Sequence, residues 1–241
     1  MKVAIPKELT HDERRVALVP DTAAKLIAAR LEVAVQAGAG TEAFIADSAY
    51  EQAGVKVVTH AADLLQDAAA VLKVQAPMPS EVELLAKDAV LISFLQPATQ
   101  GDIVKALARR GVTAFSLELL PRISRAQSMD ALSSQASAAG YKAVLMAAER
   151  LGKFFPMMMT AAGTVAPSRV LVMGAGVAGL QAIAPLGASA RSSLLTTYGR
   201  RSRKRCSRWA QRSSSWRSRP RRARAATPAS SRRSSCASSA S

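Results

Sequence analysis

The stretch from Arg169 to Ala184, RVLVMGAGVAGLQAIA, constrains the fold most, because it reads as a strand, a tight turn and a helix in succession. Its apolar run Val170–Met173 predicts a strand that is buried on both faces. Gly174, Gly176 and Gly179 then give the spacing G-x-G-x-x-G at the strand-to-helix turn. The first glycine permits the tight turn, the second lets the backbone approach a pyrophosphate, and the third lets the helix pack close to the strand. The stretch therefore predicts a dinucleotide site.

We assign five residues of this turn to cofactor binding: Gly174, Ala175, Gly176, Val177 and Gly179. Phosphates would face the N-terminus of the following helix, whose free N–H groups and dipole favour each exposed negative charge by about 0.3–1 kcal/mol. An acidic residue that binds ribose hydroxyls is expected about 20 residues further on, and the sequence has none there. A buried glycine turn without a ligand is the alternative that the motif alone leaves open.

Charge is distributed unevenly, although the formal net charge is +16. Residues 1–184 hold 18 Lys and Arg and 17 Asp and Glu, whereas residues 185–241 hold 15 basic residues and no acidic one. Both cysteines, Cys206 and Cys236, lie in this basic tail. Residues 1–184 thus carry no disulfide framework, and we expect no metal site.

We weigh two stretches as secretion or membrane signals and assign neither. The opening MKVAIPKE lacks the apolar core of a signal peptide. The uncharged run Val170–Ala190 is long enough to span a bilayer, but four glycines and one proline interrupt it. We therefore interpret this run as a strand and a helix rather than a membrane span.

Strand and helix patterns alternate from Val3 to Ser116. Pro20 opens the first helix, and Asp21 is its expected N-cap. The expected strands are Val3–Ile5, Glu32–Gln36, Val55–Val58, Ala70–Gln75, Val90–Leu95 and Val112–Ser116, separated by helices at Asp21–Arg30, Asp47–Ala53, Ala62–Gln66, Ser80–Leu85 and Gln100–Arg110. Such alternation predicts an α/β protein with a Rossmann-like, doubly wound parallel sheet.

Beyond this region we expect a polar loop, Glu118–Ser134, and a long helix, Ser133–Leu151. One face of the helix would be lined by small apolar residues suited to close packing, namely Ala136, Ala139, Ala143, Ala147 and Leu151. An apolar connector, Phe154–Ser168, follows, and we interpret its run Met157–Met159 as core filler. The predicted organisation is an N-terminal Rossmann-like domain (1–132), a linking helix and connector (133–168), the start of a second Rossmann domain (169–184) and a tail (185–241).

The loop PRISRAQSMDALSSQ, Pro121–Gln135, is one of several motifs that resemble a single known family. The others are KVAIPKE at the N-terminus, RRVALVP (Arg14–Pro20), LKVQAP (Leu72–Pro77) and the connector with its glycine turn, FFPMMMTAAGTVAPSRVLVMGAGVAGLQAIA. In order and spacing they resemble the NAD(H)-binding domain of the alpha subunit of proton-translocating NAD(P) transhydrogenases, from Met1 to about Ala184. The resemblance implies two Rossmann-like domains with NAD(H) in the cleft between them.

The resemblance also implies which residues contact the nicotinamide end of the cofactor: Arg122, Gln127, Asp130 and Ser133. An amide and a carboxylate can fix a carboxamide, and a guanidinium can brace a diphosphate or a carboxylate. From spacing alone, the alternative is that Arg122 and Asp130 pair with each other and only shape the loop. No residue is assigned a catalytic role, because hydride transfer belongs to the cofactors.

The same superfamily contains alanine dehydrogenase, whose substrate-site arginine and lysine match Arg15 and Lys73. Where that enzyme has a catalytic histidine after a leucine, this chain reads Leu95-Gln96. Glutamine cannot shuttle a proton near neutral pH as histidine can. An alanine dehydrogenase-like activity is therefore the second enzymatic hypothesis.

The family resemblance implies partners as well. NAD(H) would exchange hydride with NADP(H) on a partner subunit, while a membrane domain couples the reaction to proton movement. The implied partners are the transhydrogenase beta subunit, its membrane domain and a second copy of the chain in a homodimer. The implied location is cytoplasmic, peripheral to the inner membrane through these subunits.

The tail of residues 185–241 departs from the family pattern, and we expect it to be disordered. One hypothesis is an Arg/Ser-rich tail that binds nucleic acid nonspecifically. The other is an out-of-frame translation: with suitable codons, Leu195–Ala210 reads YDVRPAVKETVQSLG after a shift of two bases, which resembles the family and includes the missing aspartate. We favour the second hypothesis, so we expect a truncated nucleotide domain and impaired NAD(H) binding.

Overall fold

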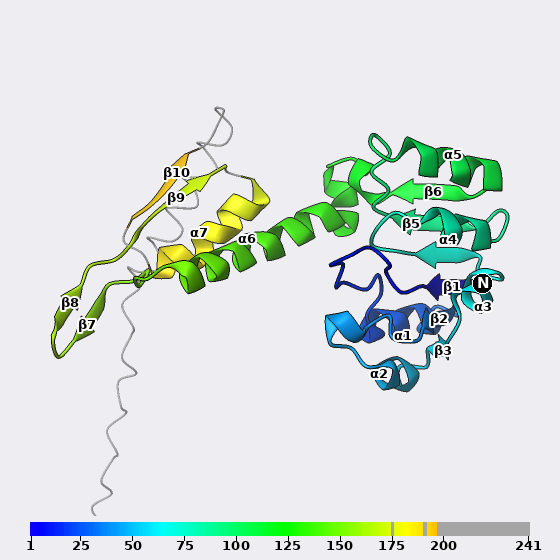
Figure 1. Ribbon diagram of the computed structural model, residues 1–241, viewed down its shortest axis with the longest axis horizontal. Coiled ribbons are helices and arrows are strands. Elements are labelled where there is room, and N and C mark those ends of the chain that lie inside the picture. Colours follow the sequence, from blue (N-terminus) through cyan, green and yellow to red (C-terminus); the bar gives the residue numbers. More distant parts are fainter. Residues whose placement is uncertain (175, 190–191, 197–241) are drawn as a thin grey trace, which may run out of the picture. The chain divides into compact units, whose positions relative to one another are not determined.

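The computed structural model of the protein describes residues 1–174, 176–189 and 192–196. The chain forms two compact units: unit 1, Met1–Ala136, and unit 2, which begins at Ser137. Figure 1 shows the elements of both.

Unit 1 alternates strands and helices, which confirms the predicted α/β class. Its strands are β1 (Lys2–Ile5), β2 (Glu32–Gln36), β3 (Lys56–Val58), β4 (Ala70–Leu72), β5 (Val90–Ser93) and β6 (Thr113–Ser116). Its helices are α1 (Pro20–Ala28), α2 (Asp47–Gln52), α3 (Ala61–Leu65), α4 (Pro79–Leu84) and α5 (Gly101–Arg110), with short 3₁₀ helices η1 (Thr41–Ala43), η2 (Leu117–Leu119) and η3 (Ser124–Met129).

The six strands form one parallel sheet in the order β3-β2-β1-β4-β5-β6, from β3 at the bottom of Figure 1 to β6 near the top. This is the strand order of dinucleotide-binding sheets. The direction of winding reverses between β1 and β4, where Val3 pairs with Ala70. Ligands of such sheets bind outside the carboxyl ends of the strands at this switch point.

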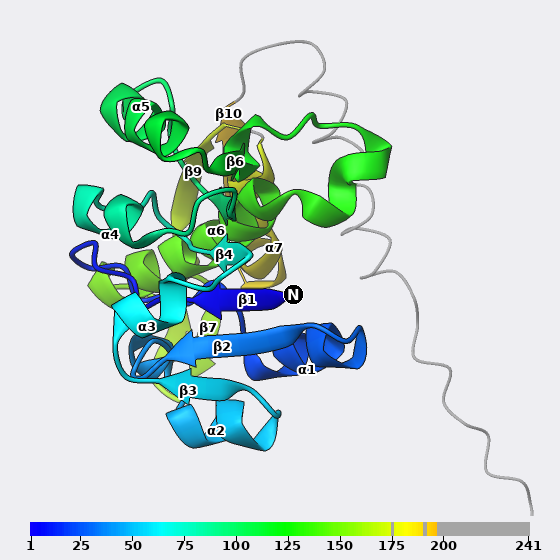
Figure 2. The ribbon, with the colours of Figure 1, turned by 90° about the vertical axis from the view of Figure 1, so that its right-hand side faces the viewer.

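Helices cover the sheet in two layers (Figure 2). On one face, Leu64 of α3 and Leu107 of α5 pack with Leu91 of β5, and each is no more than 2 % exposed. On the other face, α1 and α2 pack over β1–β3, and the Tyr50 hydroxyl donates to Leu18 O at 2.8 Å. Each large apolar side chain buried in this way stabilises the fold by about 1.5–3 kcal/mol.

The predicted N-cap of α1 is wrong. Val19 occupies that position with extended backbone, and no side chain caps the helix. Pro20 is the first helical residue, where its fixed φ suits a helix and its missing N–H would be unpaired anyway. Asp21 therefore lies inside the first turn, where its charge still favours the positive end of the helix dipole.

Unit 2 contains the predicted long helix, strand and glycine turn, together with strands β7, β8 and β10 that the sequence pattern did not predict. Helix α6 (Ala131–Arg150) begins before Ser137 and continues into it, β7 (Met158–Thr160) and β8 (Gly163–Val165) form an antiparallel hairpin, and β9 (Arg169–Met173) pairs in parallel with β10 (Ser192–Thr196). Helix α7 (Val177–Ser189) continues beyond Ala184, since its proline removes one helical hydrogen bond without ending the helix. The expectation of a disordered tail is thus corrected for 185–189 and 192–196; residues 197–241 lie outside the described residues.

The predicted packing face of α6 is also wrong. Its buried residues are Gly140 and Val144, whereas Ala139, Ala143 and Ala147 are exposed. The reason is a close approach of two helices: a Cβ on Gly140 would lie 2.2 Å from the carbonyl oxygen of Ala178 in α7. The helix therefore turns its glycine, rather than its alanines, toward α7.

Apolar residues of the connector and of β9 are exposed, contrary to expectation. Met157, Met158 and Met159 are 47 %, 38 % and 78 % exposed, so they are not core filler in the described structure. In β9, Leu171 and Met173 are 57 % and 81 % exposed. Among the described residues β9 pairs only with β10, so this strand is not buried on both faces.

Candidate functional site

The turn between β9 and α7 has the geometry that its glycines predict. Gly174 has φ +103°, which a residue with a side chain rarely adopts. A Cβ on Gly179 would lie 2.0 Å from Gly174 O, so the third glycine allows α7 to pack against the turn. A Cβ on Gly176 would meet no atom within 4 Å. The second glycine therefore leaves open space beside the backbone, where a pyrophosphate can approach.

This turn fits the phosphates of a dinucleotide but lacks a ribose ligand. Helix α7 begins at Val177, and Leu180 N–H donates to Gly176 O at 3.0 Å in its first turn. The positive end of the helix thus faces the turn, as phosphate binding requires. No acidic residue follows Glu149 in the sequence, so the acidic partner of the ribose hydroxyls is missing. Ala175 lies outside the described residues.

The loop between β6 and α6, in unit 1, brings three predicted nicotinamide contacts around one small cavity. Arg122, Gln127 and Asp130 line this cavity of about 230 Å³. Arg122 and Gln127 are exposed, whereas Ala126 between them is buried and anchors the loop. The loop therefore presents a guanidinium, an amide and a carboxylate together, which is the set of groups that can bind a carboxamide and an anion.

Ser133, the fourth predicted contact, holds the carboxylate of Asp130. Its N–H donates to Asp130 Oδ1 at 2.8 Å, and its hydroxyl donates to Oδ2 at 2.6 Å. These hydrogen bonds, first the one from the hydroxyl, lower the pKa of Asp130, and the nearby Arg122 lowers it further. No ion pair joins Arg122 to Asp130 in the described part of the chain, so the alternative that they simply pair with each other is not observed.

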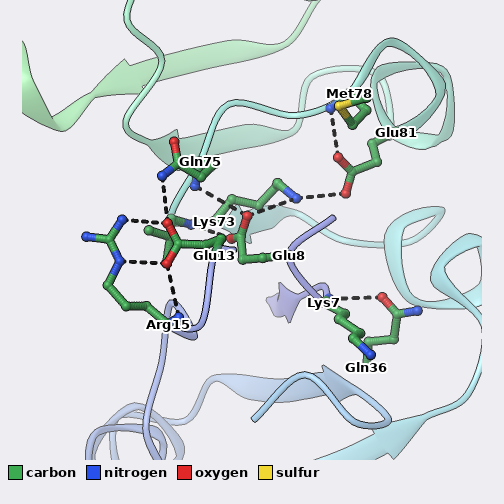
Figure 3. A network of polar contacts seen from close by, with 10 residues as sticks. Lys7, Glu8, Glu13, Arg15, Gln36, Lys73, Gln75, Met78 and Glu81 are labelled. Carbon is green, nitrogen blue, oxygen red and sulfur yellow. Dashed lines mark hydrogen bonds and ion pairs between the residues drawn. The ribbon is translucent and has the colours of Figure 1, made fainter. Parts of the chain in front are cut away.

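A second group of polar residues lies at the carboxyl ends of β1 and β4 (Figure 3). This switch-point cluster consists of Glu8, Glu13, Arg15, Lys73, Gln75 and Glu81. Lys73 lies at its centre, with Nζ 2.8 Å from Glu81 Oε1 and 3.5 Å from Glu8 Oε2. The three side chains are only 2 %, 7 % and 4 % exposed. The ammonium group of Lys73 therefore forms ion pairs with two buried carboxylates at once.

Backbone N–H groups satisfy the remaining oxygens of these carboxylates. Glu8 accepts hydrogen bonds from Val74 N–H at 2.6 Å and Gln75 N–H at 3.3 Å, which tie the loop after β1 to the end of β4. Glu81 accepts from Met78 N–H at 2.7 Å at the start of α4. Burial raises the pKa of Glu8, although Lys73 and the two N–H groups act in the opposite direction.

Glu13 fixes Arg15 in a two-point ion pair. Arg15 Nε donates to Glu13 Oε1 at 2.7 Å, and Nη2 donates to Oε2 at 2.6 Å. The hydrogen bonds from the Arg15 side chain lower the pKa of Glu13 to about 2, and the one from the Gln75 amide, at 2.6 Å, also lowers it. Arg15 further donates from Nη1 to Gln135 Oε1 at 3.3 Å.

Arg15 and Lys73, predicted from the comparison with alanine dehydrogenase, line one cavity of about 420 Å³. Gln135 adds an amide to its wall, and most of its other lining is apolar, with Leu72, Ile92 and Phe94 among the residues. Glu8, Glu13 and Glu81 were not predicted as site residues from the sequence. Glu8 and Glu13 follow β1 at the switch point, which is the signal that could have found them, whereas nothing local marks Glu81.

Comparison with known proteins follows the same division of the chain. Residues 4–139 match the model of the alanine dehydrogenase/PNT N-terminal domain, and residues 143–193 match that of the alanine dehydrogenase/PNT C-terminal domain. The chain belongs to the alanine dehydrogenase/PNT family. The predicted resemblance to the alpha subunit of NAD(P) transhydrogenases and the predicted Rossmann-like fold of residues 1–184 are thereby confirmed.

Relatives within the alanine dehydrogenase/PNT family fall into two groups. An NAD(P) transhydrogenase alpha-subunit chain of Rhodospirillum rubrum is 52 % identical over 189 residues, covering 76 % of this chain and 49 % of that protein. Alanine dehydrogenase of Bacillus subtilis is 31 % identical over 187 residues, covering 76 % and 48 %. The crystal structure of a transhydrogenase from Sinorhizobium meliloti superimposes with a TM-score of 0.83 at 42 % identity, covering 87 % of this chain and 60 % of the other.

The chain therefore spans about half the length of the curated relatives it matches. Identity is higher to the transhydrogenase than to the alanine dehydrogenase, in agreement with the order of the two enzymatic hypotheses. Within the described residues, no helix is long and apolar enough to cross a membrane.

Proposed function

We propose that this chain is the NAD(H)-binding part of a proton-translocating NAD(P) transhydrogenase. In this proposal bound NAD(H) exchanges hydride with NADP(H) held by a partner subunit, and a membrane domain couples the exchange to proton movement. The names of the transhydrogenase relatives support it, and the observation that carries it is the open space at Gly176 beside the N-terminus of α7. The cofactors supply the hydride chemistry, and this chain supplies binding and orientation.

The residues divide this work. Gly174, Gly176 and Gly179 would admit the pyrophosphate to the start of α7. Gln127 and Asp130 would hold the carboxamide of nicotinamide, since an amide and an ionised carboxylate offer the donor and the acceptors that it needs. Ser133 would keep Asp130 oriented and ionised, and Arg122 would brace an anionic group.

We further propose that this chain binds NAD(H) only weakly. The acidic ribose ligand is missing after Glu149, and Leu171 and Met173 leave the face of β9 open to water. Titration of the full chain with NADH in a calorimeter should give a dissociation constant weaker than the micromolar range, and micromolar binding would contradict weak binding. A complete homologous domain that binds NADPH tightly but not NADH would overturn the assignment itself.

A matched pair of variants tests whether the turn carries the binding. Gly176→Leu fills the open space and should abolish the NADH signal, measured by saturation-transfer NMR at millimolar NADH. Gly152→Leu is the control, because a Cβ there also meets no atom within 4 Å and the residue lies outside the turn. Equal NADH signals from both variants would show that the turn does not hold the cofactor.

The exposed β7–β8 hairpin supports a second copy of the chain as a binding partner. All three residues of β7 are exposed, and an isolated two-stranded hairpin is marginally stable in water. We propose that the hairpin is covered in a homodimer, and that the beta subunit and its membrane domain hold the chain at the cytoplasmic side of the inner membrane. Sedimentation of the full chain should show a dimer that Met159→Lys dissociates.

An alanine dehydrogenase-like activity is the second candidate, favoured by the cavity that Arg15 and Lys73 share. Gln96 cannot supply the proton that reductive amination of an oxo acid requires. Both cations are also already paired with carboxylates of the cluster. We therefore expect no oxidation of NADH by pyruvate and ammonium; measurable turnover would favour this candidate over hydride exchange.

Nucleic-acid binding by the basic tail stays a prediction from composition, since residues 197–241 lie outside the described residues. Fifteen basic residues without an acidic one would bind polyanions in a salt-dependent way whatever their origin. Only selective RNA binding that deletion of residues 185–241 abolishes would support a specific role.

A further inference from the structure

Gln96 has a backbone conformation that its sequence context opposes. Its φ is +48°, although it is not a glycine and it precedes Pro97, a position that normally favours extended backbone. Of the other described non-glycine residues with positive φ, Arg30 and Phe44 end helices, and Asp12 and Asp88 are of a type that tolerates this region. Gln96 instead follows strand β5, and its strain has no such local explanation.

The surrounding structure holds this strained residue from both sides. Its N–H donates to the carboxylate of Glu118, and its carbonyl accepts from Thr99 N–H at 2.9 Å, Thr99 Oγ1 at 3.1 Å and Gln100 N–H at 3.0 Å. The pKa of Glu118 is lowered overall: burial acts to raise it, but the hydrogen bonds that the carboxylate accepts outweigh burial. An ionised carboxylate therefore fixes the backbone, and strain persists where the surroundings impose it in this way.

The side chain of Gln96 takes no part in these bonds. It is exposed at the carboxyl edge of the sheet, and no described residue hydrogen-bonds its amide. Glu118, which fixes its backbone, opens the loop that carries Arg122, Gln127 and Asp130. The strained backbone thus leaves an amide without a described partner after β5 and is hydrogen-bonded to the residue at which the loop of proposed nicotinamide contacts begins.

We propose that Gln96 is a further residue of the nucleotide site and that its side-chain amide hydrogen-bonds the nicotinamide half of NAD(H). The inference rests on the proposed function. An amide suits the task because the carboxamide and ribose hydroxyls of the ligand need both a donor and an acceptor. Hydride transfer moves no separate proton, so a group that does not titrate is sufficient here.

Three variants of the full chain test the proposal through affinity and stability. Gln96→Gly removes the amide and relieves the strain, so NADH binding by saturation-transfer NMR should weaken about fivefold while the Tm stays equal or rises. Gln96→Asn keeps an amide in a residue that tolerates positive φ, and should bind NADH more tightly than Gln96→Gly. Arg30→Gly, which relieves strain at φ +64° beyond the end of α1, should leave NADH binding unchanged.

The outcomes separate this inference from the function on which it rests. Equal affinity of Gln96→Gly and the wild-type chain would overturn the role of Gln96 and leave the proposed function intact. A fall in affinity together with a large fall in Tm would assign Gln96 a structural role and also overturn the inference. Absence of any wild-type signal at millimolar NADH would overturn both.

Discussion

The two parallel sheets of the chain differ in how much of their apolar surface is covered. Leu91, in the middle of β5, is fully buried between helices, whereas Leu171, in the middle of β9, is 57 % exposed. Both residues lie in short apolar strands of parallel βα units. The difference shows that an apolar strand is buried only when neighbouring strands and helices are present on each side, as parallel sheets require.

The polar sites of the two units also differ in how far they are buried. Unit 1 buries Lys73 and the three carboxylates of the switch-point cluster almost completely, and each is paired. Unit 2 offers an open glycine turn with no acidic partner. Unit 1 is therefore expected to be rigid and costly to perturb, while unit 2 should tolerate substitution on its open faces.

The largest effect should come from removing the cation at the centre of unit 1. Lys73→Met leaves Glu8 and Glu81 buried without their counter-charge and should destabilise the fold by about 3–5 kcal/mol. Urea unfolding followed by circular dichroism measures this change. Lys105→Met is the control, because its ion pair with Asp102 is exposed and should contribute less than about 1 kcal/mol. Equal losses in the two variants would contradict the distinction.

A pair of leucine substitutions measures how much the burial of each parallel sheet contributes to stability. Leu91→Ala opens a cavity in a closed core and should cost about 2–5 kcal/mol, whereas Leu171→Ala should change stability by less than about 0.5 kcal/mol. Both values come from the same unfolding measurement. A cost above about 2 kcal/mol for Leu171→Ala would show that β9 is covered in solution, for example by a second copy of the chain.

The contact between α6 and α7 in unit 2 is closely packed and should resist change. A methyl group on Gly140 would lie 2.2 Å from Ala178 O, so Gly140→Ala should force α6 and α7 apart at a cost of about 1–3 kcal/mol. Faster hydrogen exchange of the α7 amides would report this. Gly152→Ala, which has open space, should leave exchange in α7 unaltered; equal acceleration in both variants would argue against the contact.

A further difference concerns the pH dependence of unit 1. Because Arg15 lowers the pKa of Glu13 to about 2 from an ordinary 4.5, the folded chain binds this proton less tightly than the unfolded chain. The stability that Glu13 contributes is present above pH 4.5 and is lost as the pH falls toward 2. Unfolding in this window should take up about one proton more in the wild type than in Glu13→Gln. Identical pH slopes would show that the pair is not formed.

Local patterns predicted most of unit 1. The alternation of apolar runs with helix starts located six strands and five helices, with ends that shift by at most three residues. The sequence predicted an irregular loop before α6, whereas the structure forms the short 3₁₀ helices η2 and η3 there. The connector was also misread, because an apolar run such as Met157–Met159 does not show whether its neighbours will cover it.

The sequence by itself determined the succession of strands and helices, the glycine turn and the family, since these depend on residue type and spacing along the chain. Tertiary structure decided the rest. It brought Glu8 and Glu81 to Lys73, turned Gly140 rather than the alanines of α6 toward α7, and placed Gln96 in a strained conformation. These features depend on contacts between segments distant in sequence, whose burial and electrostatics no local pattern contains.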